Sequence, residues 1–166
     1  MNAQEALDKL LKSYSVYYDV ERKRPAPPFV AEAAFRSHER QYFLIRSARI
    51  SEAESNEYVF FALEEELTAP LLSALEGAAW NAGLSRVAPH KDHRNTDVTL
   101  IVLASRVAPD AFALVPKLKR YKSYLFGFQG WSHFRLAVID ADAGKLAVNA
   151  QGKTLRKFLK RNLNLR

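Results

Sequence analysis

The spacing of apolar residues predicts an amphipathic helix over residues 3–14. Its apolar face consists of Ala6, Leu7, Leu10, Leu11 and Tyr14, with charged residues on the opposite side. A segment rich in arginine and proline follows and ends in Pro27 and Pro28, which do not continue a helix. We therefore expect an extended loop after the first helix.

Shorter apolar runs predict strands. Three of them, over residues 29–36, 42–50 and 58–63, are joined by short polar turns and are typical of an antiparallel meander. Residues 97–104 form an almost continuous apolar run, the pattern of a strand that is covered on both faces, so we expect it to be the central strand. Further strands are predicted over residues 124–128, 134–139 and 145–148.

Three more helices are predicted. Thr68 is expected to cap the first of them, which has Pro70 in its first turn and ends at Gly83. Pro109 opens another, which Pro116 must kink, end or restart. Thr154 is expected to cap a last, amphipathic helix over residues 154–163, with its leucines inward and its basic residues outward.

This order of elements predicts a single α/β (α+β) domain over residues 1–166, in which one mixed sheet is flanked by helices in the order α-βββ-α-β-α-βββ-α. Over residues 1–104 the order resembles the αβββαβ core of restriction-endonuclease-like proteins. Nucleases of that fold need a carboxylate on the second strand and a carboxylate-x-lysine pair on the third. Here Glu57 has no lysine two places later, and the second strand offers Arg46 and Arg49. The resemblance therefore implies a scaffold whose catalytic site is absent or moved.

Composition narrows the class of protein. The chain has 166 residues, of which 48% are hydrophobic and 26% charged, as in soluble globular proteins. It has no cysteine, which excludes thiol nucleophiles and thiolate metal sites and fits a reducing cytoplasm. Since no run of about 20 apolar residues and no signal-peptide layout is present, we expect a cytoplasmic protein without a membrane partner.

The positive charge is concentrated in the C-terminal third of the chain. The net charge of the whole chain is +7; residues 1–110 hold 13 basic and 16 acidic residues, and residues 111–166 hold 12 and 2. We call eight of these cations the basic face: Lys117, Lys119, Arg120, Lys122, Arg156, Lys157, Lys160 and Arg161. They are candidate phosphate contacts for nucleic acid, with a solubilising surface and a docking surface for an acidic protein as the alternatives.

The densest polar segment, residues 89–97, is a candidate metal site. His90 and His93 could share a divalent metal, with an oxygen ligand from Asp92 or Asp97, which would favour a metal-dependent hydrolase-like protein. A third nitrogen ligand would have to come from His38 or His133, which no spacing supports. The competing interpretation is an exposed loop whose polar side chains cap backbone groups at the start of a strand.

Two other groups of residues receive structural interpretations. The glutamates Glu52, Glu54, Glu57 and Glu64 to Glu66 are interpreted as solvated turn residues and helix N-terminal charges. Phe128, Trp131 and Phe134 are interpreted as core residues around a tight turn, although exposed aromatic rings near cations could also stack nucleic-acid bases. The sequence holds no recognised catalytic motif, so we assign no catalytic residue and lean toward a binding module.

Short motifs give one further resemblance. They are Pro89-His90-x-x-His93, Gly130-Trp131, Arg135-Leu136, Val138-Ile139-Asp140 and Glu54-x-Asn56-Glu57-Tyr58. The set resembles a family of small uncharacterised proteins from low-GC Gram-positive bacteria, over most of the chain. The resemblance implies a shared fold and supplies no activity.

Overall fold

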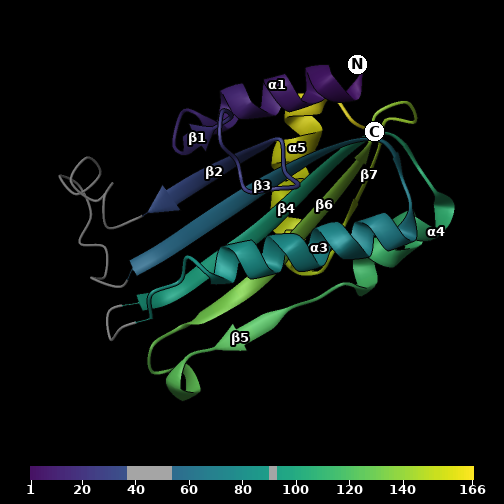
Figure 1. Ribbon diagram of the computed structural model, residues 1–166. Coiled ribbons are helices and arrows are strands. Elements are labelled where there is room, and N and C mark those ends of the chain that lie inside the picture. Colours follow the sequence, from purple (N-terminus) through teal and green to yellow (C-terminus); the bar gives the residue numbers. More distant parts are fainter. Residues whose placement is uncertain (37–53, 90–92) are drawn as a thin grey trace.

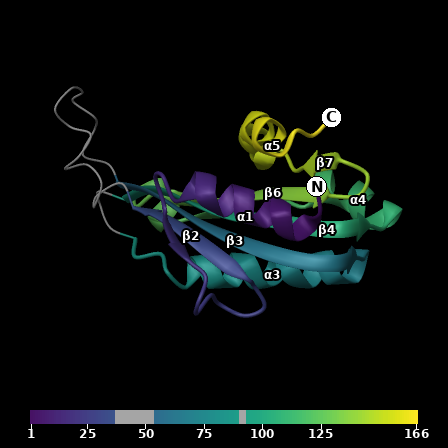
Figure 2. The ribbon, with the colours of Figure 1, turned by 90° about the horizontal axis from the view of Figure 1, so that it is seen from above.

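The computed structural model describes residues 1–36, 54–89 and 93–166, which form a single mixed sheet between two layers of helices. Helices α1 (Ala3–Tyr14) and α5 (Arg156–Leu163) cover one face of the sheet, and α3 (Ala69–Leu84) and α4 (Pro109–Leu114) cover the other (Figures 1 and 2). The predicted fold class is confirmed. None of the described helices is long and apolar enough to cross a membrane.

The described part of the sheet has seven strands in the order β1-β2-β3-β4-β6-β5, with β7 paired to β6. Their bounds are β1 Asp19–Glu21, β2 Ala31–Arg36, β3 Glu54–Leu67, β4 His93–Val107, β5 Tyr121–Ser123, β6 Trp131–Asp140 and β7 Lys145–Val148. Strands β3, β4 and β6 are parallel, whereas the outer pairs are antiparallel. Strand β2 pairs directly with β3, and the strand expected over residues 42–50 lies outside the described residues.

Strand β4 is central, as its apolar run predicts. Val98, Leu100 and Val102 face the layer of α3, and Ile101 and Leu103 face the layer of α1 and α5. Because both faces are covered, apolar residues occupy both sets of alternating positions from Leu100 to Ala104. This arrangement explains why the run is continuous rather than alternating.

The helices follow their sequence signals with two corrections. Thr68 caps α3 as predicted, but Gly83 lies inside that helix rather than ending it. A Cβ at Gly83 would lie 2.5 Å from Val98 Cγ2, so glycine lets α3 approach β4 closely. Thr154 does not cap α5, because a 3₁₀ turn (η3, Gln151–Leu155) precedes that helix and the Thr154 hydroxyl donates to the Gln151 carbonyl within it.

The strand predicted over residues 124–128 is wrong. Strand β5 ends at Ser123, and Leu125–Gly127 forms a 3₁₀ turn (η2), in which Leu125, Phe126 and Gly127 all have positive φ. A strand needs negative φ angles in the β region, and three successive residues here depart from that region.

Candidate functional site

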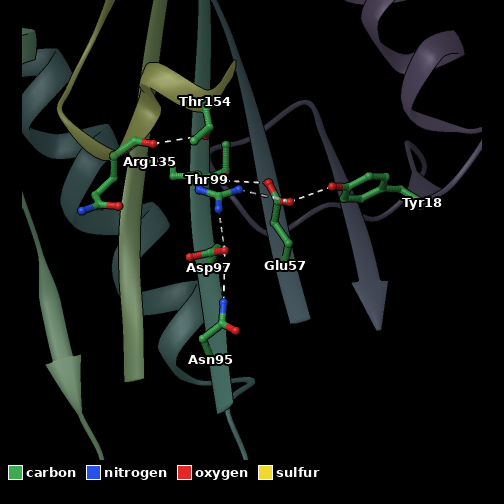
Figure 3. Close-up of polar contacts among 8 residues, drawn as sticks. Tyr18, Glu57, Asn95, Asp97, Thr99, Arg135 and Thr154 are labelled. Atoms are coloured by element: carbon green, nitrogen blue, oxygen red, sulfur yellow. Dashed lines mark hydrogen bonds and ion pairs between the residues drawn. The ribbon is translucent and has the colours of Figure 1, made fainter. Parts of the chain in front are cut away.

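Polar side chains gather on the α1–α5 side of the sheet, near the amino ends of its parallel strands (Figure 3). Glu57 on β3, Asp97 on β4 and His133 on β6 are partners in register. Two residues further along β4 and β6, Thr99 and Arg135 are also partners. Partners in register point to the same face of a sheet. The strand pairing therefore brings together residues that lie about 40 positions apart in the sequence.

Glu57 is buried and accepts hydrogen bonds from two hydroxyl groups. Thr99 Oγ1 donates to Glu57 Oε1 over 2.9 Å, and Tyr18 Oη donates to Glu57 Oε2 over 2.6 Å. Burial and the neighbouring Glu57 carboxylate both raise the pKa of Tyr18, so this phenol stays protonated and remains a donor. The contact ties the segment after α1 to the sheet.

Arg135 connects the two buried carboxylates. Its Nη2 lies 2.8 Å from Asp97 Oδ2, and its Nη1 lies 3.6 Å from Glu57 Oε2. Asn95 Nδ2 also donates to Asp97 Oδ2, over 3.3 Å. Burial raises the pKa of Asp97, and the Glu57 charge acts in the same direction, whereas Arg135 and His133 lower it.

A cavity of about 420 Å³ opens beside this group, lined by Tyr17, Tyr18, Phe35, Ser55, Asn56, Glu57, Asp97 and Arg135. Two carboxylates and one guanidinium leave one net negative charge when both acids are ionised. With both acids ionised, this wall disfavours a phosphate group and favours a small polar molecule that donates hydrogen bonds or carries a positive charge. The cavity and the basic face are therefore electrostatically different surfaces.

The metal site expected at residues 89–97 stays a prediction, which the described residues do not test. His38, His90 and Asp92 lie outside them, and His93 begins β4. Asp97 forms an ion pair with Arg135. Among the residues that the structure describes, no three His, Asp or Glu side chains are grouped so that they could hold a metal ion.

Sequence interpretation is wrong for one member of this polar group and assigns no role to another. The interpretation of Glu57 as a solvated turn residue is wrong, since it is buried on β3. Arg135 had no assigned role. A usable signal was present: Glu57 and Asp97 each immediately precede a buried apolar run, where an isolated carboxylate needs a partner.

Every side chain of the basic face except Lys160 is exposed, and Lys160 is half-buried. Within the described part of the chain, Arg120 alone among the eight forms a salt bridge, to Glu76 on α3. Arg120 Nε lies 2.6 Å from Glu76 Oε1, and Arg120 Nη2 lies 3.2 Å from Glu76 Oε2, a two-bond contact that raises the pKa of Arg120. The Glu76 side chain is only 6% exposed, so this pair contributes to the fold.

We expect Arg120→Ala to lower the free energy of unfolding by about 2 kcal/mol, because it leaves the buried Glu76 carboxylate without a cation. The neighbouring exposed Lys119 is the matched control, and Lys119→Ala should change stability by less than about 0.5 kcal/mol. Urea unfolding followed by circular dichroism measures both values. Equal stabilities for the two variants would contradict a structural role for the Arg120–Glu76 pair.

Comparison with known proteins gives one match. A family model described as "Domain of unknown function (DUF8052)" matches residues 2–161. No curated protein and no solved structure matches the chain.

Proposed function

The chain belongs to the DUF8052 family, whose description assigns no activity, and we propose that it is a nucleic-acid-binding module that contacts phosphates through the basic face. Seven of the eight cations of this face have no salt-bridge partner among the described residues, so their charge is available to an anion. Lysine and arginine at exposed positions neutralise phosphates and release counterions, which gives binding that depends on salt and not on base sequence.

The observation that carries the proposal is the contact between the two basic segments. Asn149 Nδ2 donates to the Leu118 carbonyl over 2.9 Å, and Asn149 Oδ1 accepts from the Gly152 amide over 2.8 Å. The segment of Lys117 and Lys119 and the segment that leads into α5 are therefore joined by one side chain. Two chain segments that carry cations and are separate in sequence are thus linked through their backbones beside β6 and β7.

The uneven distribution of charge along the chain also supports the proposal. The C-terminal 56 residues have a net charge of 12 − 2 = +10, and residues 1–110 have 13 − 16 = −3. Such an asymmetric charge distribution orients a polyanion toward one part of the surface.

A salt titration with matched charge variants tests the proposal. The basic-face variant combines Lys119→Gln, Lys122→Gln, Arg156→Gln and Lys157→Gln, all at exposed positions. The control combines Lys9→Gln, Lys23→Gln, Arg24→Gln and Arg106→Gln, which are also exposed and change the net charge by the same amount. Substitution is preferable to truncation after Gly152, because Leu155, Leu159 and Leu163 belong to the core.

For the wild-type chain we expect the affinity for a fluorescent oligonucleotide to fall steeply with salt concentration. The basic-face variant should reduce the slope of log K against log salt by about 0.7–0.9 for each phosphate that it no longer neutralises, and the control should leave the slope unchanged. Absence of binding at low salt, or an equally reduced slope in the two variants, would overturn the proposal.

A further inference from the structure

The turn between β5 and β6 presents large apolar side chains to solvent. Leu125 is 61% exposed, Phe126 95% and Phe128 80%, and we call these three residues the aromatic tip. Of the eight large apolar side chains that are exposed in the described part of the chain, four lie within residues 121–128. A local concentration of this kind marks an interaction site rather than ordinary surface variation.

The backbone holds the tip in a strained conformation. Leu125 and Phe126 have φ values of 49° and 53°, a region that costs a non-glycine residue about 1–3 kcal/mol. Hydrogen bonds fix the turn: the amides of Gly127 and Gln129 both donate to the Tyr124 carbonyl, over 3.0 and 3.1 Å. The two phenylalanine rings are thus directed outward by a defined turn, which lowers the entropy cost when a ligand binds.

Cations and further aromatic rings adjoin the tip. Lys122 Nζ lies 5.5 Å from the centre of the Tyr124 ring, and Lys119 precedes it on the same segment. Tyr121 is 60% exposed, and its ring lies against His133 on β6 with 5.1 Å between ring centres. Lysines of the basic face therefore alternate with aromatic rings along this hairpin.

We propose that the aromatic tip stacks on the bases of single-stranded nucleic acid while the adjoining lysines contact its phosphates. This inference rests on the proposed function and names the form of nucleic acid that the basic face binds. Single strands expose base faces to aromatic rings, whereas duplexes keep those faces stacked inside. The aromatic character of four positions, Tyr121, Tyr124, Phe126 and Phe128, favours base stacking over insertion of an aliphatic loop into a lipid surface.

Three double variants at Phe126 and Phe128 separate stacking from general apolar contact. Phe126→Ala with Phe128→Ala removes the rings, the corresponding pair of leucine substitutions keeps apolar bulk without rings, and the pair of tryptophan substitutions enlarges the rings. The probes are a poly-dT oligonucleotide, a DNA duplex of equal length and anionic phosphatidylserine vesicles. Both side chains are exposed, so thermal unfolding should be almost the same for all four proteins and serves as the folding control.

For poly-dT we expect the alanine and leucine pairs to bind at least about tenfold more weakly than the wild type, and the tryptophan pair to bind at least as tightly. Duplex affinity and the salt slope should not change in any of them. Unchanged poly-dT affinity in the alanine pair, with wild-type binding intact, would overturn the inference and leave the proposed function standing. Vesicle binding that the leucine pair retains and the alanine pair loses, without an effect on poly-dT, would assign the tip to membranes. No binding of either nucleic acid by the wild type would overturn both proposals.

Discussion

Asn149→Ala is expected to lower the free energy of unfolding by about 4 kcal/mol, because this side chain is 1% exposed and satisfies four backbone groups. Its Oδ1 accepts from the amides of Leu136 and Gly152, and its Nδ2 donates to the carbonyls of Leu118 and Phe134. Alanine leaves all four groups without this partner, three of them in buried and one in part-buried positions. Each missing buried hydrogen bond costs about 1–3 kcal/mol before relaxation.

For a chain of this size the destabilisation corresponds to a fall in Tm of roughly 8–16 °C, which differential scanning calorimetry measures. The control is Asn81→Ala, the same substitution at an exposed position of α3, which should change the stability by less than about 0.5 kcal/mol. Similar melting temperatures for the two variants would contradict the role of Asn149. Asn149→Ala leaves the net charge unchanged. Because Asn149 joins the two basic segments, we nevertheless expect this variant to bind nucleic acid more weakly than the wild type.

The surroundings of Asn149 show which features of the fold a single sequence conceals. A Cβ on Gly152 would lie 2.4 Å from the Leu136 carbonyl oxygen, so glycine is required there by a contact between segments. No local pattern distinguishes this glycine from one in a flexible loop. Patterns with a local cause were predicted well: α1 has the apolar period of 3.6 residues, and the buried run of β4 has no polar face.

The polar group around Arg135 was predicted poorly for the same physical reason. Asp97 is predicted from sequence as a candidate metal ligand with His90 and His93, and no local pattern predicts its ion pair with Arg135 on the neighbouring strand. The Asp97–Arg135 ion pair can be predicted only when the register of β4 against β6 is known. In that register Arg135 is the partner of Thr99, two residues after Asp97 on β4. The register depends on how three apolar runs pack against the helices on both faces, and this information is distributed over the chain.

The exposure of Phe128 was also mispredicted, and here the competing effect is local. Burial is the usual state of a large aromatic side chain, so Phe128 was expected in the core with Trp131 and Phe134. Phe134 is fully buried and Trp131 is half-buried, but Phe128 is 80% exposed because the strained η2 turn directs it away from the sheet. Because a large aromatic ring is usually buried, the exposure of Phe128 makes this turn a candidate binding site.

The second large effect is expected from Arg135→Met, which removes the cation between two buried carboxylates and keeps much of the apolar stem. We expect a decrease of about 3 kcal/mol in the free energy of unfolding at neutral pH, because Glu57 and Asp97 then repel each other without a partner. Double substitution with Asp97→Asn removes one of the two charges. The double variant should therefore be more stable than Arg135→Met alone, a positive coupling that a double-mutant cycle measures.

The destabilisation by Arg135→Met should depend on pH in a defined direction. The pKa of Asp97 is already above its ordinary value in the folded chain, and the removal of Arg135, which lowers it, must raise it further. A folded state with a raised carboxyl pKa binds a proton that the unfolded state releases, so the contribution of this group to stability falls as pH rises through the folded pKa. Below the unfolded pKa of about 4 both states are protonated and the penalty disappears. Urea unfolding from pH 7.5 down to pH 4.5 should therefore show the variant approaching the wild type, and a constant difference across this range would show that Arg135 acts by packing rather than by charge.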